Sequence, residues 1–181
     1  MVHHPDPDPV APAPRLGLVL GGARSGKSRF AEALLGRVAA PWTYIATAQA
    51  FDDEMRARIA EHRRRRDARW HAVEAPLDLT GAIRAASGPV LVDCLTLWLS
   101  NLLLGGHDVD RAGDALEAAL AGRAQPTVLV SNEVGLGVVP DNALARRFRD
   151  HAGRLHQRIA AQADLVVFMV AGLPIHVKGP P

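Results

Sequence analysis

The sequence predicts an α/β protein built on a mainly parallel β-sheet, with helices on both of its faces. Short apolar runs of strand length alternate along the chain with longer segments of helical pattern. These runs are apolar throughout, whereas a half-exposed strand would alternate apolar and polar residues. Strands of that kind, separated by helices, are typical of a sheet covered by helices on each side.

The elements of the N-terminal half follow from local pattern. Leu16–Leu20 is an apolar run closed by two glycines, which predicts a first strand. Ser28–Val38 places its apolar residues on one helical face. Trp42–Ala46 is rich in aromatic and β-branched residues, so we expect a second strand there. The charged segment Asp52–Arg69 favours a helix that ends before Trp70.

The middle of the chain continues the alternation. Val90–Asp93 predicts a third buried strand, and Leu95–Leu104 predicts a mostly buried helix. Asp110–Ala121 favours a polar helix, and Thr127–Ser131 gives a fourth strand.

The C-terminal part is expected to add a long amphipathic helix and two strands. Asp141 or Asn142 would cap the helix, because short polar side chains accept hydrogen bonds from the first free N–H groups. Leu165–Val170 predicts a fifth strand, and Ile175–Val177 an edge strand. The apolar residues expected on one face of the helix are Leu144, Phe148, Leu155 and Ile159.

Length and composition limit the class of protein. The chain has 181 residues and one cysteine, Cys94, so a disulfide scaffold within the chain is excluded. The formal net charge of +2 is too small to argue for a nucleic-acid partner. No apolar run approaches the roughly 18 residues of a membrane span, and the N-terminus lacks a secretory pattern, so we expect a cytoplasmic protein.

A phosphate-binding loop is expected between the first strand and the first helix. The pattern G-x-x-x-x-G-K-[ST] is matched in every position by Gly21, Gly22, Ala23, Arg24, Ser25, Gly26, Lys27 and Ser28. Glycines let backbone N–H groups converge on phosphate oxygens, and the start of the helix adds positive charge. A plain glycine turn before a helix is the alternative. We therefore predict a three-layer P-loop NTPase fold, with residues 15–181 as one catalytic domain and residues 1–14 as a disordered proline-rich tail.

Three side chains are expected to act on the nucleotide phosphates. Lys27, which shares its residue type only with Lys178, would neutralise the β- and γ-phosphates. Ser28 and Asp93 would hold Mg²⁺, Asp93 from the end of a buried strand. An Asp at such a place can also serve only as a helix cap.

A cluster around His62 narrows the chemistry. Glu54, Arg58 and His62 share one helical face, and four arginines, Arg63, Arg64, Arg65 and Arg66, follow directly. The cluster could be a solvated helix with ion pairs. Alternatively, a largely neutral imidazole could attack phosphorus while guanidinium groups neutralise the triphosphate. A nucleic-acid-binding role is disfavoured, because no aromatic side chains on which bases could stack accompany the arginines.

Several segments together resemble a known family. They are the P-loop, Tyr44–Gln49, the run from Asp52 to His62, Trp70 with Glu74, and Ser131–Pro140 leading into Arg146–Asp150. Together they resemble the bifunctional adenosylcobinamide kinase/adenosylcobinamide-phosphate guanylyltransferase family of cobalamin biosynthesis. The resemblance runs from about Leu18 to Lys178.

The resemblance implies two reactions. A nucleoside triphosphate, ATP or GTP, first phosphorylates adenosylcobinamide; GTP then guanylylates an enzyme histidine, and GMP passes to adenosylcobinamide phosphate. It implies a RecA-like fold, a homotrimer and His62 as the histidine. The implied nucleotide contacts are the P-loop from Gly21 to Ser28, Thr47, Ala48, Gln49, Arg63 to Arg66, Glu74 and Asp93.

The chain departs from the family pattern at three positions. His156 stands where the family usually has Asn, which changes a local hydrogen bond. Glu61 stands where a second His can occur, and Asp93 where Glu can stand. Asn132 and Glu133, at the end of a strand, would cap a turn or help to bind the cobinamide side. A monofunctional small-molecule kinase and a non-enzymatic nucleotide-sensing or nucleic-acid-binding module remain as alternatives.

Overall fold

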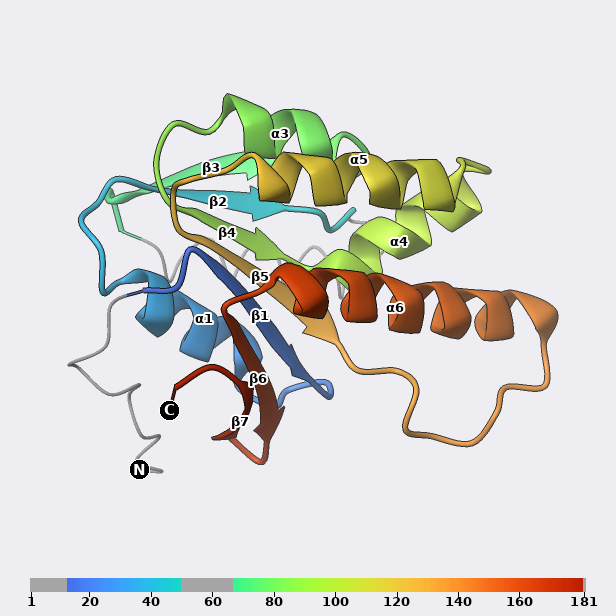
Figure 1. The fold of residues 1–181 in the computed structure, drawn as a ribbon. Coiled ribbons are helices and arrows are strands. Elements are labelled where there is room, and N and C mark those ends of the chain that lie inside the picture. Colours follow the sequence, from blue (N-terminus) through green and yellow to red (C-terminus); the bar gives the residue numbers. More distant parts are fainter. Residues whose placement is uncertain (1–12, 50–66, 181) are drawn as a thin grey trace.

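The computed structural model describes residues 13–49 and 67–180. Within them, seven strands form one sheet in the order β3-β2-β4-β5-β1-β6-β7 (Figure 1). All neighbouring pairs are parallel except β6 and β7, which are antiparallel. The strands are β1 (Leu16–Gly21), β2 (Trp42–Ala46), β3 (Trp70–Glu74), β4 (Val90–Asp93), β5 (Thr127–Asn132), β6 (Leu165–Val170) and β7 (Leu173–Lys178).

Helices cover both faces of the sheet, so the predicted α/β class is confirmed. They are α1 (Lys27–Leu35), α3 (Leu79–Ala85), α4 (Leu95–Leu104), α5 (Val109–Ala121) and α6 (Ala143–Gln162). In Figure 1, α1 lies on one face, and the other four lie on the opposite face. The described helices include none that is long and apolar enough to cross a membrane.

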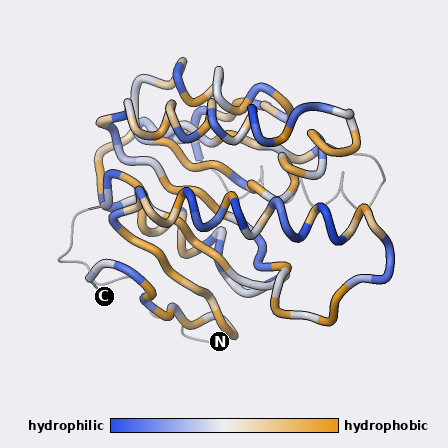
Figure 2. Tube along the Cα trace, turned by 45° about the vertical axis from the view of Figure 1, so that its right-hand side comes forward, coloured by the Kyte–Doolittle hydropathy of each residue, from blue (hydrophilic) through white to orange (hydrophobic). Residues whose placement is uncertain are grey.

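The core forms two apolar layers, one on each side of the sheet. Phe30 and Leu34 of α1 pack with Val128 and Val130 of β5 on one side. On the other side, Trp98 is 2% exposed and packs with residues of the remaining helices. Figure 2 shows the strands as mostly hydrophobic and the helices as alternating stretches of both kinds. Burial on both faces explains why the inner strands are apolar nearly throughout.

Some expected element bounds need correction. Asp67, Ala68 and Arg69 form a turn before β3 and not the end of a helix. Residues 52–66 of the expected helix and residues 1–12 of the expected tail over 1–14 lie outside the described residues. Leu144, expected on the buried face of α6, is 47% exposed, because the first turn of this helix extends beyond the sheet. Sequence reasoning also missed β3 and α3 as elements.

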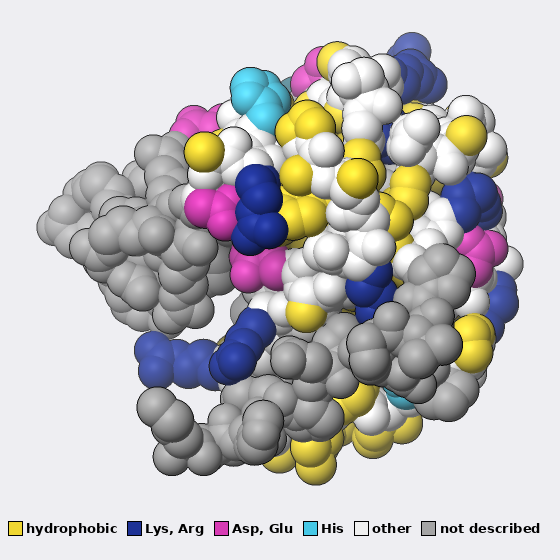
Figure 3. Space-filling model, turned by 90° about the vertical axis from the view of Figure 1, so that its left-hand side faces the viewer, with side chains coloured by type: hydrophobic (Ala, Val, Ile, Leu, Met, Phe, Trp, Pro, Cys, Tyr) yellow, Lys and Arg dark blue, Asp and Glu magenta, His cyan; other side chains and the backbone are white. Residues whose placement is uncertain are grey.

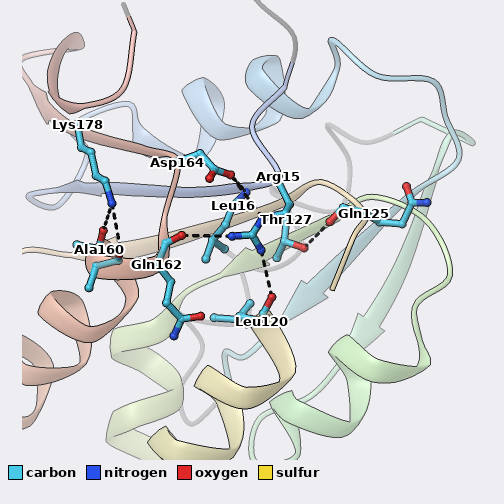
Figure 4. A network of polar contacts seen from close by, with 10 residues as sticks. Arg15, Leu16, Leu120, Gln125, Thr127, Ala160, Gln162, Asp164 and Lys178 are labelled. Carbon is cyan, nitrogen blue, oxygen red and sulfur yellow. Dashed lines mark hydrogen bonds and ion pairs between the residues drawn. The ribbon is translucent and has the colours of Figure 1, made fainter. Parts of the chain in front are cut away.

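Polar contacts tie the helix ends to the edge of the sheet where the parallel strands begin. Arg15 donates to Leu120 O at 3.4 Å and to Gln162 O at 3.3 Å, so it joins the ends of α5 and α6 to the start of β1 (Figure 4). Lys178 donates to two carbonyl groups in the last turn of α6. Figure 3 views this edge; basic side chains lie scattered there among acidic and hydrophobic ones.

Candidate nucleotide-binding site

The opposite edge, where the parallel strands end, brings the described candidate residues together. Register places Glu74 beside Ala46, and Ala46 beside Asp93. Farther along the same edge, Asn132 lies beside Gly21, the first residue of the phosphate-binding loop. The strands with these residues end on one side of the sheet in Figure 1. Ligands of open α/β sheets bind at this edge, so the register supports the predicted location.

The phosphate-binding loop needs glycine at two of its positions. A Cβ atom on Gly21 would lie 2.6 Å from Ser25 Oγ and 2.8 Å from Met169 O, so no larger side chain fits. Gly26 caps α1 with φ of 90°, a left-handed conformation that L-residues with side chains rarely adopt. Arg24 also has a positive φ of 56°. The loop is therefore held in a conformation that its glycines make possible.

The turn between β6 and β7 forms a wall beside this loop. A Cβ atom on Gly26 would be 3.6 Å from the Cα of Gly172. Ala171 and Gly172 have φ values of 52° and 84°, the pair of positive angles that a tight two-residue hairpin requires. Sequence reasoning gave this turn no role, because only the tertiary structure places it against the loop.

Lys27 points back into the loop. Its side chain is largely buried, and Nζ donates to Gly22 O at 2.8 Å. Burial of the ammonium group is the main influence on the pKa of Lys27 and lowers it, while electrostatic interactions with Cys94 and with the Asp93 carboxylate act in the opposite direction. The loop therefore contains a desolvated cation, and a bound phosphate would favour its charged form.

The loop also offers polar groups that need an acceptor. The first N–H groups of α1 have no partner within the helix, and its cap Gly26 supplies no side-chain bond. No acidic residue lies in the first turn of α1. Ser25 Oγ is buried and makes no hydrogen bond to described protein atoms. Such a set of donors at a helix N-terminus suits an anion.

Asp93 faces the loop from the end of β4. The hydroxyl of Tyr44 donates to Asp93 Oδ2 at 2.9 Å and so fixes the carboxylate. The Asp93 charge acts to raise the pKa of Lys27, so it lies near the phosphate-binding loop. The Ser28 hydroxyl and the Asp93 carboxylate are oxygen donors of the kind that Mg²⁺ prefers, so these residues fit the predicted ion.

A buried hydrogen-bond network sets the path of the chain after β2. Thr47 is fully buried; its hydroxyl donates to Cys94 O at 2.7 Å and accepts from Cys94 N at 2.8 Å. Asn101 of α4 donates through Nδ2 to Thr47 O and to Pro76 O. The Thr47 hydroxyl is therefore hydrogen-bonded to the backbone of Cys94 through both of these contacts. Ala48 and Gln49, which follow it, are partly exposed.

A second polar cluster follows β5. Ser131 Oγ lies 2.7 Å from His156 Nε2, and His156 Nδ1 lies 4.0 Å from Glu133 Oε2. Burial lowers the pKa of His156, although the nearby Glu133 charge acts to raise it. The imidazole of His156 on α6 is therefore held by a serine hydroxyl of β5. Sequence reasoning named all three residues but could not show that they meet.

The predicted site residues divide into two groups. The P-loop residues, Thr47, Ala48, Gln49, Glu74 and Asp93 are described and lie at or near the carboxyl edge of the sheet. His62 and the arginines Arg63, Arg64, Arg65 and Arg66 lie outside the described residues. Their roles stay predictions.

Comparison with known proteins gives one consistent result. The family described as cobinamide kinase / cobinamide phosphate guanyltransferase matches residues 17–177. The bifunctional adenosylcobalamin biosynthesis protein CobP of Pseudomonas aeruginosa is 53% identical over 169 residues, with 91% of this chain and 98% of that protein covered. The bifunctional adenosylcobalamin biosynthesis protein CobU of Salmonella typhimurium is 46% identical over 179 residues, with 89% and 98% covered.

A solved structure supports the fold separately. An ATPase from the type III secretion system of pathogenic bacteria superposes with a TM-score of 0.51 at 11% identity, covering 91% of this chain and 59% of that chain. At that identity the similarity concerns the fold alone.

Proposed function

Because the chain belongs to the cobinamide kinase/cobinamide phosphate guanyltransferase family, we propose that it performs both reactions of that family on adenosylcobinamide. In the first, a nucleoside triphosphate phosphorylates a hydroxyl group of adenosylcobinamide. In the second, GTP transfers GMP to an enzyme histidine with release of pyrophosphate, and GMP then passes to adenosylcobinamide phosphate. The product is adenosylcobinamide-GDP.

The kinase half is supported mainly by the geometry of the phosphate-binding loop. The loop and the start of α1 contain the buried ammonium group of Lys27, the Ser25 hydroxyl without a partner among the described atoms, and the first N–H groups of α1. Such an arrangement binds the polyphosphate tail and lowers the energy of charge that develops on the transferred phosphoryl group. Ser28 and Asp93 would hold Mg²⁺, which neutralises phosphate charge when bound.

The guanylyltransferase half is supported by the sequence and by the relatives. His62 is followed by four arginines, which would neutralise the triphosphate as pyrophosphate departs. An imidazole is substantially neutral near pH 7, so it attacks phosphorus without a separate base. The curated relatives are named as bifunctional, which favours two activities over one.

The decisive experiment is mass spectrometry of the protein after incubation with GTP and Mg²⁺. We expect a covalent GMP adduct on His62, labile in acid and stable in base, that is absent from His62→Ala. His107→Ala is the matched control, because His107 is exposed after α4 and is not part of the proposed site. A wild-type protein without an adduct would refute the transferase half.

A monofunctional kinase is the second candidate, and the same variants distinguish it. In that case His62→Ala would keep all activity of the protein, whereas Lys27→Ala would lose it through the missing phosphate charge. Transfer of label from γ-labelled ATP to adenosylcobinamide measures the kinase half directly.

The proposed homotrimer has support in the exposed surface of β7. This strand lies at the edge of the sheet, and it pairs only with β6 among the described elements. Leu173, Ile175 and Val177 alternate along it and are 56%, 52% and 65% exposed. An apolar edge strand is readily covered by another chain. Light scattering of the purified protein would give the mass; a monomer at micromolar concentration would contradict this assembly.

A further inference from the structure

Glu133 is the described carboxylate at the carboxyl edge whose backbone directly contacts the phosphate-binding loop. Its N–H donates to Gly21 O at 3.0 Å, which continues the pairing of β5 with β1 by one residue. Asp93 lies at the end of β4, one strand farther from β1, and Glu74 lies on β3, three strands beyond β5. With a strand spacing of about 4.8 Å, the strands of Asp93 and Glu74 are roughly 10 and 19 Å from β1.

The carboxylate of Glu133 is hydrogen-bonded at Oε1, lies near His156 through Oε2 and stays accessible. Gly135 N donates to Oε1 at 2.5 Å, and Oε2 faces His156 Nδ1 at 4.0 Å. The Glu133 side chain is 23% exposed, so part of it is accessible to a substrate. In Figure 1 the connection from β5 to α6 leaves the sheet where the strands end, so Glu133 stands at the entrance of this connection.

The imidazole of His156 is held at Nε2, the ring nitrogen that faces away from Glu133. It lies on α6 with its side chain 8% exposed, and Ser131 Oγ contacts Nε2 at 2.7 Å. An ionised carboxylate only accepts hydrogen bonds, so the favourable tautomer of a neutral imidazole carries its proton on Nδ1 toward Glu133. Nε2 then accepts from the Ser131 hydroxyl. Ser131 thus holds the imidazole by a hydrogen bond, and the imidazole presents Nδ1 to the Glu133 carboxylate at 4.0 Å.

Phosphorylation of a hydroxyl group releases a proton that needs an acceptor. Building on the kinase function proposed above, we propose that Glu133 accepts this proton, and that His156 is the positioning residue that directs the carboxylate. The substrate oxygen forms a bond to the γ-phosphorus, the bond from that phosphorus to the β,γ-bridging oxygen breaks, and ADP leaves with the electron pair. The hydroxyl proton moves to the Glu133 carboxylate and then to water.

The test compares Glu133→Gln with wild type in single-turnover transfer from γ-labelled ATP to adenosylcobinamide. The amide keeps the size of the side chain but does not accept the proton, so we expect the rate to fall about 100- to 10,000-fold. The Kd for ATP is expected to stay within about threefold of wild type. Asp141→Asn is the matched control, since Asp141 is an exposed carboxylate in the same connection, and we expect its rate to equal that of wild type.

A double-mutant cycle tests the positioning role of His156. We expect His156→Ala to lower the kinase rate at unchanged Kd for ATP, and His156→Asn to restore part of it through a hydrogen bond to Ser131. In the Glu133→Gln background, His156→Ala should cause no further loss, because His156 acts through the carboxylate. Full additivity of the two losses would refute that role.

The outcomes separate this proposal from the function on which it rests. GMP adduct formation from GTP is expected at the wild-type level in Glu133→Gln, which also shows that the variant is folded. A Glu133→Gln protein with wild-type kinase rate would overturn the role of Glu133 and leave the kinase intact. Equal loss of kinase rate, ATP binding and adduct formation would overturn it in favour of a structural role. Wild-type protein without kinase activity would instead overturn the proposed function.

Discussion

Asn101 offers the sharpest test of how the chain after β2 is held near the nucleotide site. Its side chain is 7% exposed, and Nδ2 donates to Thr47 O at 2.8 Å and to Pro76 O at 2.9 Å. One amide on α4 therefore joins the segments that follow β2 and β3. Asn101→Leu keeps a similar volume but removes both donors.

The expected cost follows from the two carbonyl groups that lose their partner. A hydrogen bond contributes about 1 to 1.5 kcal/mol net, and a buried group left unpaired costs at least as much. Loss of both bonds should lower the free energy of unfolding by about 2 to 3 kcal/mol. For a chain of this size, that corresponds to a fall in Tm of about 4 to 12 °C.

Urea denaturation followed by circular dichroism measures this change, with calorimetry for Tm. Gln157→Leu is the control, because Gln157 is an exposed amide on α6, and we expect it to stay within about 0.5 kcal/mol of wild type. Asn101→Asp should destabilise at least as strongly as Asn101→Leu, since a carboxylate would face two carbonyl oxygens. A free energy of unfolding for Asn101→Leu within 0.5 kcal/mol of wild type, by the same criterion, would refute the reasoning.

Three further predictions concern His156 and the phosphate-binding loop. Burial lowers the pKa of His156 from 6.5 in the unfolded chain, and Glu133 is the charged group that faces it; the contribution of neutral His156 to stability is therefore present above about pH 6.5 and is lost as pH falls toward the folded pKa. In this pH range, urea titrations of His156→Asn should give a slope of the free energy of unfolding against pH that is smaller than in wild type by up to about 1.4 kcal/mol per pH unit. An unchanged slope would count against the burial of His156 as its cause. Gly26→Ala should lower the free energy of unfolding by about 1 to 2 kcal/mol, because the φ of 90° at Gly26 is strained for a residue with a side chain. Gly137→Ala is the control and should change it little, because a Cβ atom there would meet no other described atom within 4 Å. Equal effects of the two variants in calorimetry would contradict this prediction. Lys27→Met should weaken ATP binding about 10- to 100-fold in equilibrium dialysis, because the charge that faces the phosphates is removed. The free energy of unfolding should not fall, because an apolar side chain replaces a buried charge. Wild-type affinity for ATP would exclude the proposed role of Lys27.

Sequence reasoning failed where the signal is weak or short. β3 was missed because its central residues His71 and Ala72 are exposed, so the segment lacks the continuous apolar pattern of the inner strands. α3 spans only seven residues and includes Gly81, which is a poor helix former. Asp78 caps this helix by accepting from Gly81 N, a signal that could have revealed it.

The sequence by itself determined the phosphate-binding loop, the sheet with helices on both faces, and the family. These features depend on residues adjacent in the chain or on local periodicity, so the order of residue types is sufficient to predict them. Tertiary structure alone decided that Asn101 spans two strand ends, that Gly172 lies against Gly26, and that His156 stands between Ser131 and Glu133. Such contacts join residues 23 to 146 positions apart, and strand order and packing, set by burial of the whole core, determine which side chains meet.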